Sequence, residues 1–485
     1  MEIKNFLHPG SIAVIGASRD PKKIGNQLLD NIISGGYEGK IYPINLKEEE
    51  ILGIKAYKNV SEIGENVSLA VIVIPSSLVP GEVENCAKNN IKNFVIITAG
   101  FSEVGKEGEE LEHKLESVAK KYGLNILGPN CLGFINSSIR LNATFAETDL
   151  KEGSIAVFSQ SGAIGSAVLD WFLGREFGIS IFASLGNKTI LDECDFLEYL
   201  INDEKSSCAV LYLEEINNGK RFMDVVSRLT AKKPVVLLKS GKTSEGKRAA
   251  MSHTGSLAGE YETILAGARR ANAIVVDTIE ELFLFMKFFK RNLSVDDSRI
   301  ALVSNAGGPL VITTDYASQK GLKFHDFDDA LKGELTEILP EVRTINNPLD
   351  ILGDADADRY RRAIDKIISN RSFQSLLILL TPQTSTQIME TVNIILEAGK
   401  KYPDKLITTC FIGGRSLEEA KAMLDRSASV INFDFPNQAV KCLSRYVRYL
   451  NNRNNPPYTY FRDDTPVYKG VQEDYLVGLS LLQKF

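Results

Sequence analysis

Short apolar runs rich in valine, isoleucine and leucine alternate with longer amphipathic stretches along most of this chain. Such runs are typical of parallel strands buried on both faces, and the stretches between them are typical of crossover helices. The runs occupy residues 12–15, 41–44, 70–74, 94–98, 125–127, 155–158, 179–183, 209–213, 235–238, 273–276, 300–303, 376–380, 406–409 and 430–433. The pattern therefore predicts an α/β fold built on doubly wound parallel sheets.

The length of the chain predicts several such sheets rather than one. A chain of 485 residues is too long for one core, and a prior of about 150 residues per domain suggests three. Polar breaks before fresh strands place the domains at 1–149, 150–294 and 295–450. The tail, 451–485, differs in composition, and we predict no role for it.

Composition narrows the function classes. The net charge of −6 argues against nucleic acid as the main partner. The six cysteines show no CxxC spacing, and no residue set predicts a metal site. The chain opens without a signal peptide, and no apolar run approaches the roughly 20 residues that span a bilayer. We therefore expect a cytoplasmic protein that does not enter a membrane.

Turns of small residues follow the first strands, where parallel sheets bind ligands. Gly16, Ala17 and Ser18 come directly after the first strand, and such a turn lets backbone N–H groups approach a phosphate. The turn departs from GxGxxG, so it favours a phosphate-bearing ligand over a dinucleotide with hydride chemistry. The alternative is a set of ordinary strand–helix turns. Other candidates at the same edge are Asn45, Lys47, Ile74, Pro75, Ala99, Gly100 and Asn130.

Two later turns have the same design. Ser161, Gly162 and Ala163 follow a strand and open an apolar helix, and Gly307 and Gly308 do so again in the last third. Each turn offers free N–H groups and the positive end of a helix dipole to an anion. Two such turns predict that one phosphoryl group is held between opposed helix N-termini.

A histidine among small residues is the candidate nucleophile. His253 lies in the run 250–259, which predicts an exposed loop, and its imidazole can accept a phosphoryl group and pass it on. Glu214 and Glu215 end a strand of the same domain, and one carboxylate could fix the tautomer of the imidazole. A polar loop histidine and a solvated acidic strand end are the alternatives.

These residues together resemble the α subunit of the NDP-forming acyl-CoA synthetases, and within that family the ADP-forming acetyl-CoA synthetases. The α subunit of succinyl-CoA synthetase is similar at a greater distance. The likeness extends from His8 to Arg448. The motifs that carry it are Ile15-Gly16-Ala17-Ser18, Tyr42-Pro43-Ile44-Asn45, Gly128-Pro129-Asn130-Cys131-Leu132-Gly133, Ser159-Gln160-Ser161-Gly162, Ser184-Leu185-Gly186-Asn187-Lys188 and Ser252-His253-Thr254-Gly255. Leu46 departs from the proline usual in relatives.

The resemblance implies a Rossmann-like CoA-binding domain followed by two flavodoxin-like domains, one carrying the phosphohistidine and one a ligase–CoA domain. It also implies a reaction in which acyl-CoA and phosphate give an acyl phosphate and CoA. The acyl phosphate then phosphorylates a histidine, and ADP becomes ATP at a second site with Mg²⁺. In the family that second site lies on an ATP-grasp β subunit, so the resemblance implies an α2β2 assembly and allows an α–α contact.

The resemblance also assigns residues. His253 matches the phosphorylated histidine, and Glu214 matches its supporting carboxylate, with Glu215 left open. The serine and glycine turns at 161–163 and 307–308 match the phosphate-binding helix N-termini. The family holds CoA where this chain has Gly16, Ala17, Ser18, Asn45, Lys47, Ile74, Pro75, Ala99 and Gly100, with Asn130 near the thioester.

Two rival functions follow from the same residues. A CoA-binding regulatory or scaffold protein without catalysis would share the fold, but it would have no need of His253. An NAD-dependent oxidoreductase would need an intact glycine fingerprint and an acidic residue at the end of the second strand, where Asn45 stands.

Overall fold

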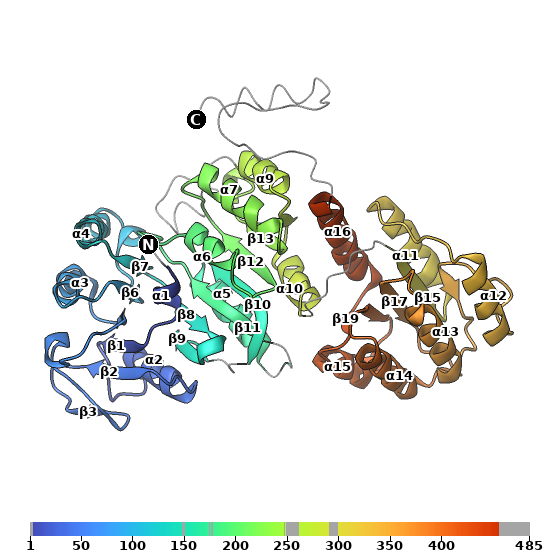
Figure 1. Ribbon diagram of the computed structural model, residues 1–485, viewed down its shortest axis with the longest axis horizontal. Helices are drawn as coiled ribbons and strands as arrows, with labels where there is room; N and C mark the ends of the chain where they lie inside the picture. The colour runs from blue at the N-terminus through green and yellow to red at the C-terminus, as the bar shows by residue number, and fades with distance from the viewer. Residues whose placement is uncertain are drawn as a thin grey trace, which may run out of the picture.

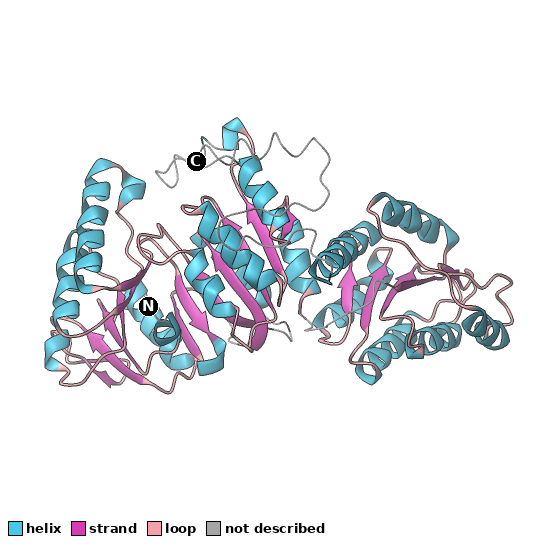
Figure 2. Ribbon diagram, turned by 45° about the horizontal axis from the view of Figure 1, so that its top comes forward, coloured by secondary structure: helices cyan, strands magenta, loops and turns pink. Residues whose placement is uncertain are grey.

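Three α/β units lie in a row in the computed structural model of this protein (Figure 1). The structure describes residues 3–147, 151–173, 175, 178–246, 248, 261–290 and 299–454. Helices flank the strands of each unit in the turned view (Figure 2). The predicted α/β class with parallel, doubly wound sheets is confirmed.

The first unit is built on five parallel strands in the order β2-β1-β5-β6-β7. Side chains alternate across a strand, so Ile12 and Val14 join the core on the α2 face, whereas Ala13 and Ile15 join the core that contains α3 and α4. The elements are α1 (Ile3–Leu7), β1 (Ser11–Ile15), α2 (Ile24–Ser34), β2 (Lys40–Ile44), β3 (Glu50–Ile51), β4 (Ile54–Lys55), η1 (Val60–Glu62), β5 (Leu69–Ile72), η2 (Ser76–Leu78), α3 (Val79–Lys88), β6 (Asn93–Ile96), η3 (Ser102–Val104), α4 (Lys106–Tyr122) and β7 (Asn125–Leu127).

The second sheet has seven strands in the order β14-β13-β12-β10-β11-β8-β9. Five are parallel, and the hairpin β8–β9 adds to the edge of β11 in antiparallel pairing. This hairpin precedes position 149, so the chain enters the second sheet before the boundary expected from the sequence. The elements are β8 (Gly133–Asn136), η4 (Ser137–Ile139), β9 (Leu141–Thr144), β10 (Glu152–Ser159), α5 (Gly162–Phe172), β11 (Ile179–Ser184), α6 (Glu193–Leu200), β12 (Cys208–Leu213), α7 (Gly219–Thr230), β13 (Val235–Lys239), α9 (Tyr261–Arg270), β14 (Ile274–Val276) and α10 (Ile279–Phe288).

The third sheet has five parallel strands in the order β16-β15-β17-β18-β19. Its elements are β15 (Ile300–Ser304), α11 (Gly307–Gln319), α12 (Asp329–Ile338), β16 (Leu349–Asp350), α13 (Ala357–Ser369), β17 (Ser375–Leu380), α14 (Ile388–Lys401), β18 (Leu406–Phe411), η5 (Arg415–Leu417), α15 (Glu418–Arg426), β19 (Ile431–Phe433) and α16 (Pro436–Asn454).

All three units share one strand order. When the five parallel strands of each unit are numbered along the chain, every sheet reads 2-1-3-4-5. In this arrangement the chain changes direction between strands 1 and 3, and ligands bind at that point beyond the carboxyl ends of the strands. The switch points are β1/β5, β10/β12 and β15/β17.

Helix α16 fastens the third unit to the second, and it lies between them in Figure 1. Tyr449 donates from its hydroxyl to the carbonyl oxygen of Thr230 at 2.9 Å. Lys441 and Arg445 bind the buried carboxylate of Glu281 at 2.7 and 2.9 Å. The helix continues to Asn454, past the point where the composition of the sequence changes.

All six cysteines are buried as free thiols. Within the described part of the chain, no helix has the length and apolar character that crossing a membrane requires. The same residues hold no group of three His, Cys, Asp or Glu side chains arranged to bind a metal ion.

Candidate functional site

The turn after β1 is shaped by a glycine. Gly16 has φ +95°, and a Cβ there would lie 2.3 Å from the carbonyl oxygen of Val73, so only glycine fits. Asn45 donates from Nδ2 to the carbonyl oxygen of Ala17 at 2.7 Å and ties the turn to the end of β2. Ser18 follows, partly exposed. The structure therefore brings these residues together at the switch point of the first sheet.

A second turn follows β2 at the same edge. Asn45 accepts hydrogen bonds at Oδ1 from the backbone N–H groups of Lys47 and Glu48 at 2.8 and 3.1 Å. Leu46 is 79% exposed and Lys47 is also exposed. The ammonium of Lys47 is thus available to an anionic ligand at this edge.

The ends of β5 and β6 complete the edge. Thr98 donates from Oγ1 to the carbonyl oxygen of Ile74 at 2.8 Å, which joins the two strand ends. Pro75 and Ala99 are exposed, and Gly100 has φ +102°. All four of the predicted residues here therefore lie side by side beyond the carboxyl ends of neighbouring strands.

The turn after β7 docks on the second unit. Asn187, in the loop after β11, donates from its backbone N–H to the carbonyl oxygen of Pro129 at 3.0 Å. Asn130 donates from Nδ2 to Oδ1 of Asn187 at 3.3 Å. A Cβ on Gly186 would lie 2.1 Å from the carbonyl oxygen of Pro129, so the two loops are in close contact. Asn130 therefore stands where the first and second units meet.

Asn187 also binds acidic side chains of the first unit. Its Nδ2 lies 2.8 Å from Oε2 of Glu103, 3.0 Å from Oε2 of Glu112 and 3.1 Å from Oγ of Ser102. Burial acts to raise the pKa of Glu103, but hydrogen bonds from Asn187 and from the backbone of Gly100 outweigh it and hold that pKa below its ordinary value. Glu103 is therefore a stable anion that holds both the loop of the second unit and the end of β6.

The tandem glutamates lie at the end of β12 on a turn held by buried side chains. Glu214 and Glu215 are 8% and 9% exposed. Gln160 accepts at Oε1 from both of their N–H groups, at 2.9 and 3.0 Å. Lys239 donates to the carbonyl oxygen of Glu214 at 2.6 Å, and Lys188 donates to that of Glu215 at 2.8 Å. Every backbone polar group of the two glutamates thus has a side-chain partner.

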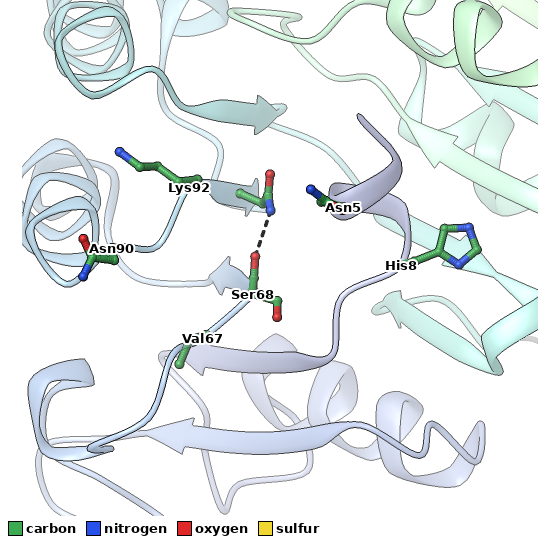
Figure 3. A pocket seen from close by; sticks show the side chains of 7 residues that line it. Asn5, His8, Val67, Ser68, Asn90 and Lys92 are labelled. Carbon is green, nitrogen blue, oxygen red and sulfur yellow. Dashed lines mark hydrogen bonds between the residues drawn. The ribbon is translucent and has the colours of Figure 1, made fainter. Parts of the chain in front are cut away.

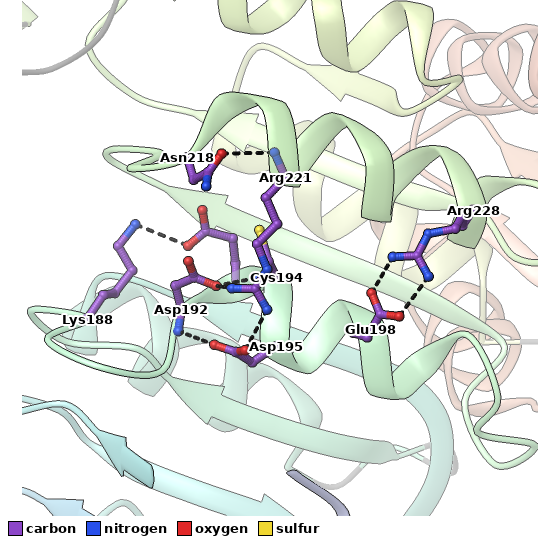
Figure 4. A network of polar contacts seen from close by, with 9 residues as sticks. Lys188, Asp192, Cys194, Asp195, Glu198, Asn218, Arg221 and Arg228 are labelled. Atoms are coloured by element: carbon purple, nitrogen blue, oxygen red, sulfur yellow. Dashed lines mark hydrogen bonds and ion pairs between the residues drawn. The ribbon is translucent and has the colours of Figure 1, made fainter. Parts of the chain in front are cut away.

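Lys188 belongs to a buried ion pair at the start of α6 (Figure 4). Its Nζ lies 3.1 Å from Oε2 of Glu193, and both side chains are at most 1% exposed. Burial raises the pKa of Glu193, and the charge of Lys188 opposes that rise. Arg221 of α7 binds Asp192 and Asp195 beside this pair at 3.2 and 2.6 Å. The network fixes the start of α6 under the glutamate turn.

The N-terminus of α5 lies at the switch point of the second sheet. Ser161 caps the helix by accepting from the N–H of Ile164 at 3.4 Å. Ser159 donates from Oγ to the carbonyl oxygen of Ser161 at 2.7 Å. Gly162 has open space where a side chain would stand, and Ala163 is exposed. The turn can therefore receive an anion.

The N-terminus of α11 lies at the switch point of the third sheet. Gly308 has open space where a side chain would stand, and the helix has no side-chain cap at Ala306. Asp350 lies close by, because its Oδ2 is 3.1 Å from where a Cβ of Gly307 would be. The turn is accessible, but a carboxylate already stands beside it.

The two turns that the sequence predicts to bind phosphate belong to separate units. Helices α10 and α16 lie between α5 and α11 in Figure 1. Across the part of the chain that the structure describes, no hydrogen bond joins Gly162 to Gly307 or Gly308. Joint binding of one phosphoryl group by both turns therefore stays a prediction.

His253 lies outside the described residues. The described chain before and after it, the end of β13 and the start of α9, belongs to the unit that carries Glu214. Which glutamate supports the histidine also stays open.

Sequence reasoning gave no role to the side chains that hold the glutamate turn. Gln160 and Lys188 stood in motifs without a function, and Lys239 carried no signal, because a lysine at a strand end is usually exposed. Asn187, Glu103 and their contacts between units were also missed, since they join loops 84 residues apart in the sequence.

A polar hollow lies at the amino ends of the strands of the first sheet, on the side away from the candidate site (Figure 3). In it Asn93 donates from Nδ2 to the carbonyl oxygen of Ser68 at 2.9 Å. These residues flank the amino ends of β5 and β6, away from the edge where parallel sheets bind ligands. The residues lining the hollow are Asn5, His8, Val67, Ser68, Asn90, Lys92 and Asn93.

Comparison with known proteins places two domain families on this architecture. The CoA binding domain family matches residues 10–137, and the succinyl-CoA ligase like flavodoxin domain family matches residues 152–289. The first match covers the edge built from Gly16, Asn45 and Gly100. The second covers the turns that carry Ser161 and Glu214.

The chain is also similar to whole proteins. It is 40% identical to the ADP-forming acetate–CoA ligase I of Archaeoglobus fulgidus, over 92% of this chain and 64% of that protein. It is 36% identical to the α subunit of the ADP-forming acetate–CoA ligase I of Pyrococcus furiosus, over 93% of this chain and 98% of that subunit. The structure of acetyl-coenzyme A synthetase 1 from Candidatus Korarchaeum cryptofilum, solved with phosphate and ADP, superposes with a TM-score of 0.89 at 34% identity, covering 93% of this chain and 97% of that one.

Proposed function

This chain belongs to the family of ADP-forming acetate–CoA ligases, and we propose that it is the α subunit that converts acyl-CoA and phosphate into CoA, a carboxylic acid and a phosphorylated histidine. The family expected from the motifs is confirmed. The chain spans 64% of the length of the Archaeoglobus ligase and 98% of the length of the Pyrococcus α subunit.

The observation that carries the proposal is the contact between the first two units. Asn187 binds Asn130 and Glu103 of the first unit, and the next residue, Lys188, binds the carbonyl oxygen of Glu215. A thioester held at the edge of the first sheet would therefore lie beside the turn of the tandem glutamates. Acyl transfer and phosphoryl transfer could then take place in one continuous site.

The proposed chemistry has two steps on this chain. A phosphate oxygen attacks the thioester carbonyl, the bond to sulfur breaks, and CoA leaves from an acyl phosphate. An imidazole nitrogen of His253 then attacks phosphorus, and the carboxylate leaves with the electrons of the broken P–O bond. Glu214 or Glu215 accepts a hydrogen bond from the other ring nitrogen and stabilises the developing positive charge.

The helix N-terminus of α5 would hold the phosphoryl group during these steps. The open space at Gly162 admits an anion close to the backbone N–H groups, where the helix dipole favours negative charge. The same role for Gly307 and Gly308 requires the third unit to approach this site.

ADP phosphorylation requires a second site, and we assign it to an ATP-grasp β subunit that binds ADP with Mg²⁺. An α2β2 assembly would bring phosphorylated His253 to that subunit. Acetate, the acid of the named relatives, is the first acyl group to test. One methylene changes the free energy of binding by only about 1–3 kcal/mol, so the acyl-CoA esters of related acids should be tested beside acetyl-CoA.

The proposal is tested by release of CoA in the absence of ADP. The chain is incubated with acetyl-CoA and phosphate, and free CoA is measured by chromatography against a reaction without phosphate. Release that depends on phosphate supports the proposal. Tight binding of CoA with no release, even with an ATP-grasp partner present, would instead favour the CoA-binding scaffold.

A further inference from the structure

Lys188 connects the two halves of the candidate site. Its side chain is fully buried, and its Nζ donates to the carbonyl oxygen of Glu215 at 2.8 Å while pairing with Glu193 at 3.1 Å. The preceding residue, Asn187, binds Glu103 and Asn130 of the first unit. Two consecutive residues of one loop therefore hold the edge of the first sheet and the glutamate turn of the second.

The backbone of this loop is held in one conformation. Lys188 has φ +56°, a value that is uncommon for a residue other than glycine. Gly186 has φ +59° and lies against the carbonyl oxygen of Pro129. Two further hydrogen bonds, from the N–H of Asn187 and of Thr189, run to the turn after β7. The ammonium of Lys188 is thus placed by contacts with the first unit.

The glutamate turn depends on that ammonium. The carbonyl oxygen of Glu215 is buried with its residue, and Lys188 supplies a charged donor to it. Gln160 holds the N–H groups of both glutamates, and Lys239 holds the carbonyl oxygen of Glu214. Removing Lys188 would take away the charged donor to the Glu215 carbonyl while leaving these other contacts in place.

We propose that Lys188 is a positioning residue for phosphoryl transfer to His253. In this role Lys188 fixes the position of the Glu214–Glu215 turn relative to the carboxyl ends of the strands of the first sheet, where the thioester would be held. This inference rests on the proposed function. A displacement of about 1 Å in a reacting group can lower a rate by about 100-fold. Lys188 acts through the Glu215 peptide and has no need to touch the substrate.

The test compares two variants that each remove a buried ammonium donating to a backbone carbonyl. Lys188→Met removes the contact with Glu215. Lys405→Met removes a 2.8 Å hydrogen bond to the carbonyl oxygen of Phe373 in the third unit, and Lys405 is 7% exposed. Each protein is assayed for thermal unfolding, for the dissociation constant of CoA, and for the single-turnover rate of label incorporation from labelled phosphate at saturating acetyl-CoA.

We expect Lys188→Met to lower the labelling rate by about 100-fold. Its dissociation constant for CoA should stay within about threefold of wild type, because the CoA edge keeps its own contacts. Lys405→Met should keep the labelling rate and the dissociation constant for CoA of wild type and should lose only thermal stability. A second variant, Lys188→Gln, keeps a buried donor but is uncharged and one bond shorter, so it weakens the contact with the Glu215 carbonyl. It should also lower the labelling rate, with a smaller loss of stability than Lys188→Met.

The outcomes separate the two proposals. If wild type is labelled and both Lys188 variants label as fast as Lys405→Met, the positioning role is wrong and the proposed function stands. If wild type itself takes no label at His253, with or without the β subunit, the proposed function fails and the inference fails with it. A rate and CoA affinity that fall together would show a general structural role and overturn the inference.

Discussion

Gln160 accepts the backbone N–H of Glu214 at 2.9 Å, across the switch point between β10 and β12. The third unit repeats this relationship, because Asn305 accepts the N–H of Thr381 at 2.9 Å between β15 and β17. In both units an amide side chain after strand 1 fixes the chain that follows strand 3. The turn that carries the glutamates is therefore part of the scaffold of the sheet.

Gln160→Leu should destabilise the protein. It leaves the buried N–H groups of Glu214 and Glu215 without their acceptor, at a cost of about 1–3 kcal/mol for each. The free energy of unfolding, measured with denaturant, checks this value. Gln27→Leu, at an exposed position of α2, is the matched control and should stay within about 0.5 kcal/mol of wild type. Equal stability of the two variants would contradict the account of the turn.

Glu214→Gln and Glu215→Gln should separate the roles of the two carboxylates. We expect the residue that supports the imidazole to be Glu214, and its variant should lose at least about 100-fold in the rate of histidine phosphorylation. Glu215→Gln keeps the backbone contact with Lys188 and should lose far less. The rate of label incorporation measures both, and a larger loss at Glu215 would reverse the assignment.

Much of the fold follows from apolar runs. The run predicted at 209–213 corresponds to β12, which begins one residue earlier at Cys208 and is buried along nearly all of its length. The hairpin β8–β9 has no such signal, because its strands bury Asn136, Asn142 and Thr144. Thr144 donates from Oγ1 to Oδ1 of Asn142 at 2.7 Å, and Asn136 donates from Nδ2 to the carbonyl oxygen of Leu7 at 2.9 Å. Strand β16 has only two residues, which are too few to show a pattern of apolar residues in the sequence.

The candidate site was predictable where it follows strand ends. Glu214 and Gly16 each come directly after a predicted strand, so topology alone places them at the ligand edge. Lys188 and Lys239 were not predictable, because lysine is almost never fully buried unless it is paired. Their partners lie 27 and 25 residues away along the chain, and only the folded structure brings them together.

Gly16→Ala should impair CoA binding and folding together. Gly16 and Gly105 both have φ +95°, but only at Gly16 would a Cβ lie 2.3 Å from a backbone oxygen. Gly105→Ala therefore carries the conformational strain alone, about 1–2 kcal/mol, and is the matched control. Calorimetry should show CoA affinity reduced by at least about tenfold in Gly16→Ala and little changed in Gly105→Ala. Equal affinity in both would place CoA away from this turn.

The contact of α16 with the second unit should weaken in acid. Burial acts to raise the pKa of Glu281, but hydrogen bonds from Lys441, the backbone of Asp277 and Arg445 hold it below its ordinary value of 4.5. Its stabilising effect is therefore complete above pH 4.5 and is lost as the pH falls through the lowered pKa.

Glu281→Gln should lose that stabilisation at neutral pH as well, about 1–3 kcal/mol, and its melting temperature should depend less on pH between 3 and 5 than that of wild type. Glu280→Gln is the control, since the Glu280 carboxylate is exposed and binds only Gln438 among the contacts described for it. An unchanged pH dependence in Glu281→Gln would show that other groups control the acid sensitivity.

The central claim is that this chain passes a phosphoryl group through His253, and labelling tests it most directly. Wild type and His253→Asn are incubated with labelled phosphate and acetyl-CoA, alone and with an ATP-grasp β subunit. The account predicts label on wild type alone that is labile in acid and stable in base, and that is discharged by ADP when the β subunit is present. Equal labelling of His253→Asn, or full turnover by that variant with the β subunit, would contradict it.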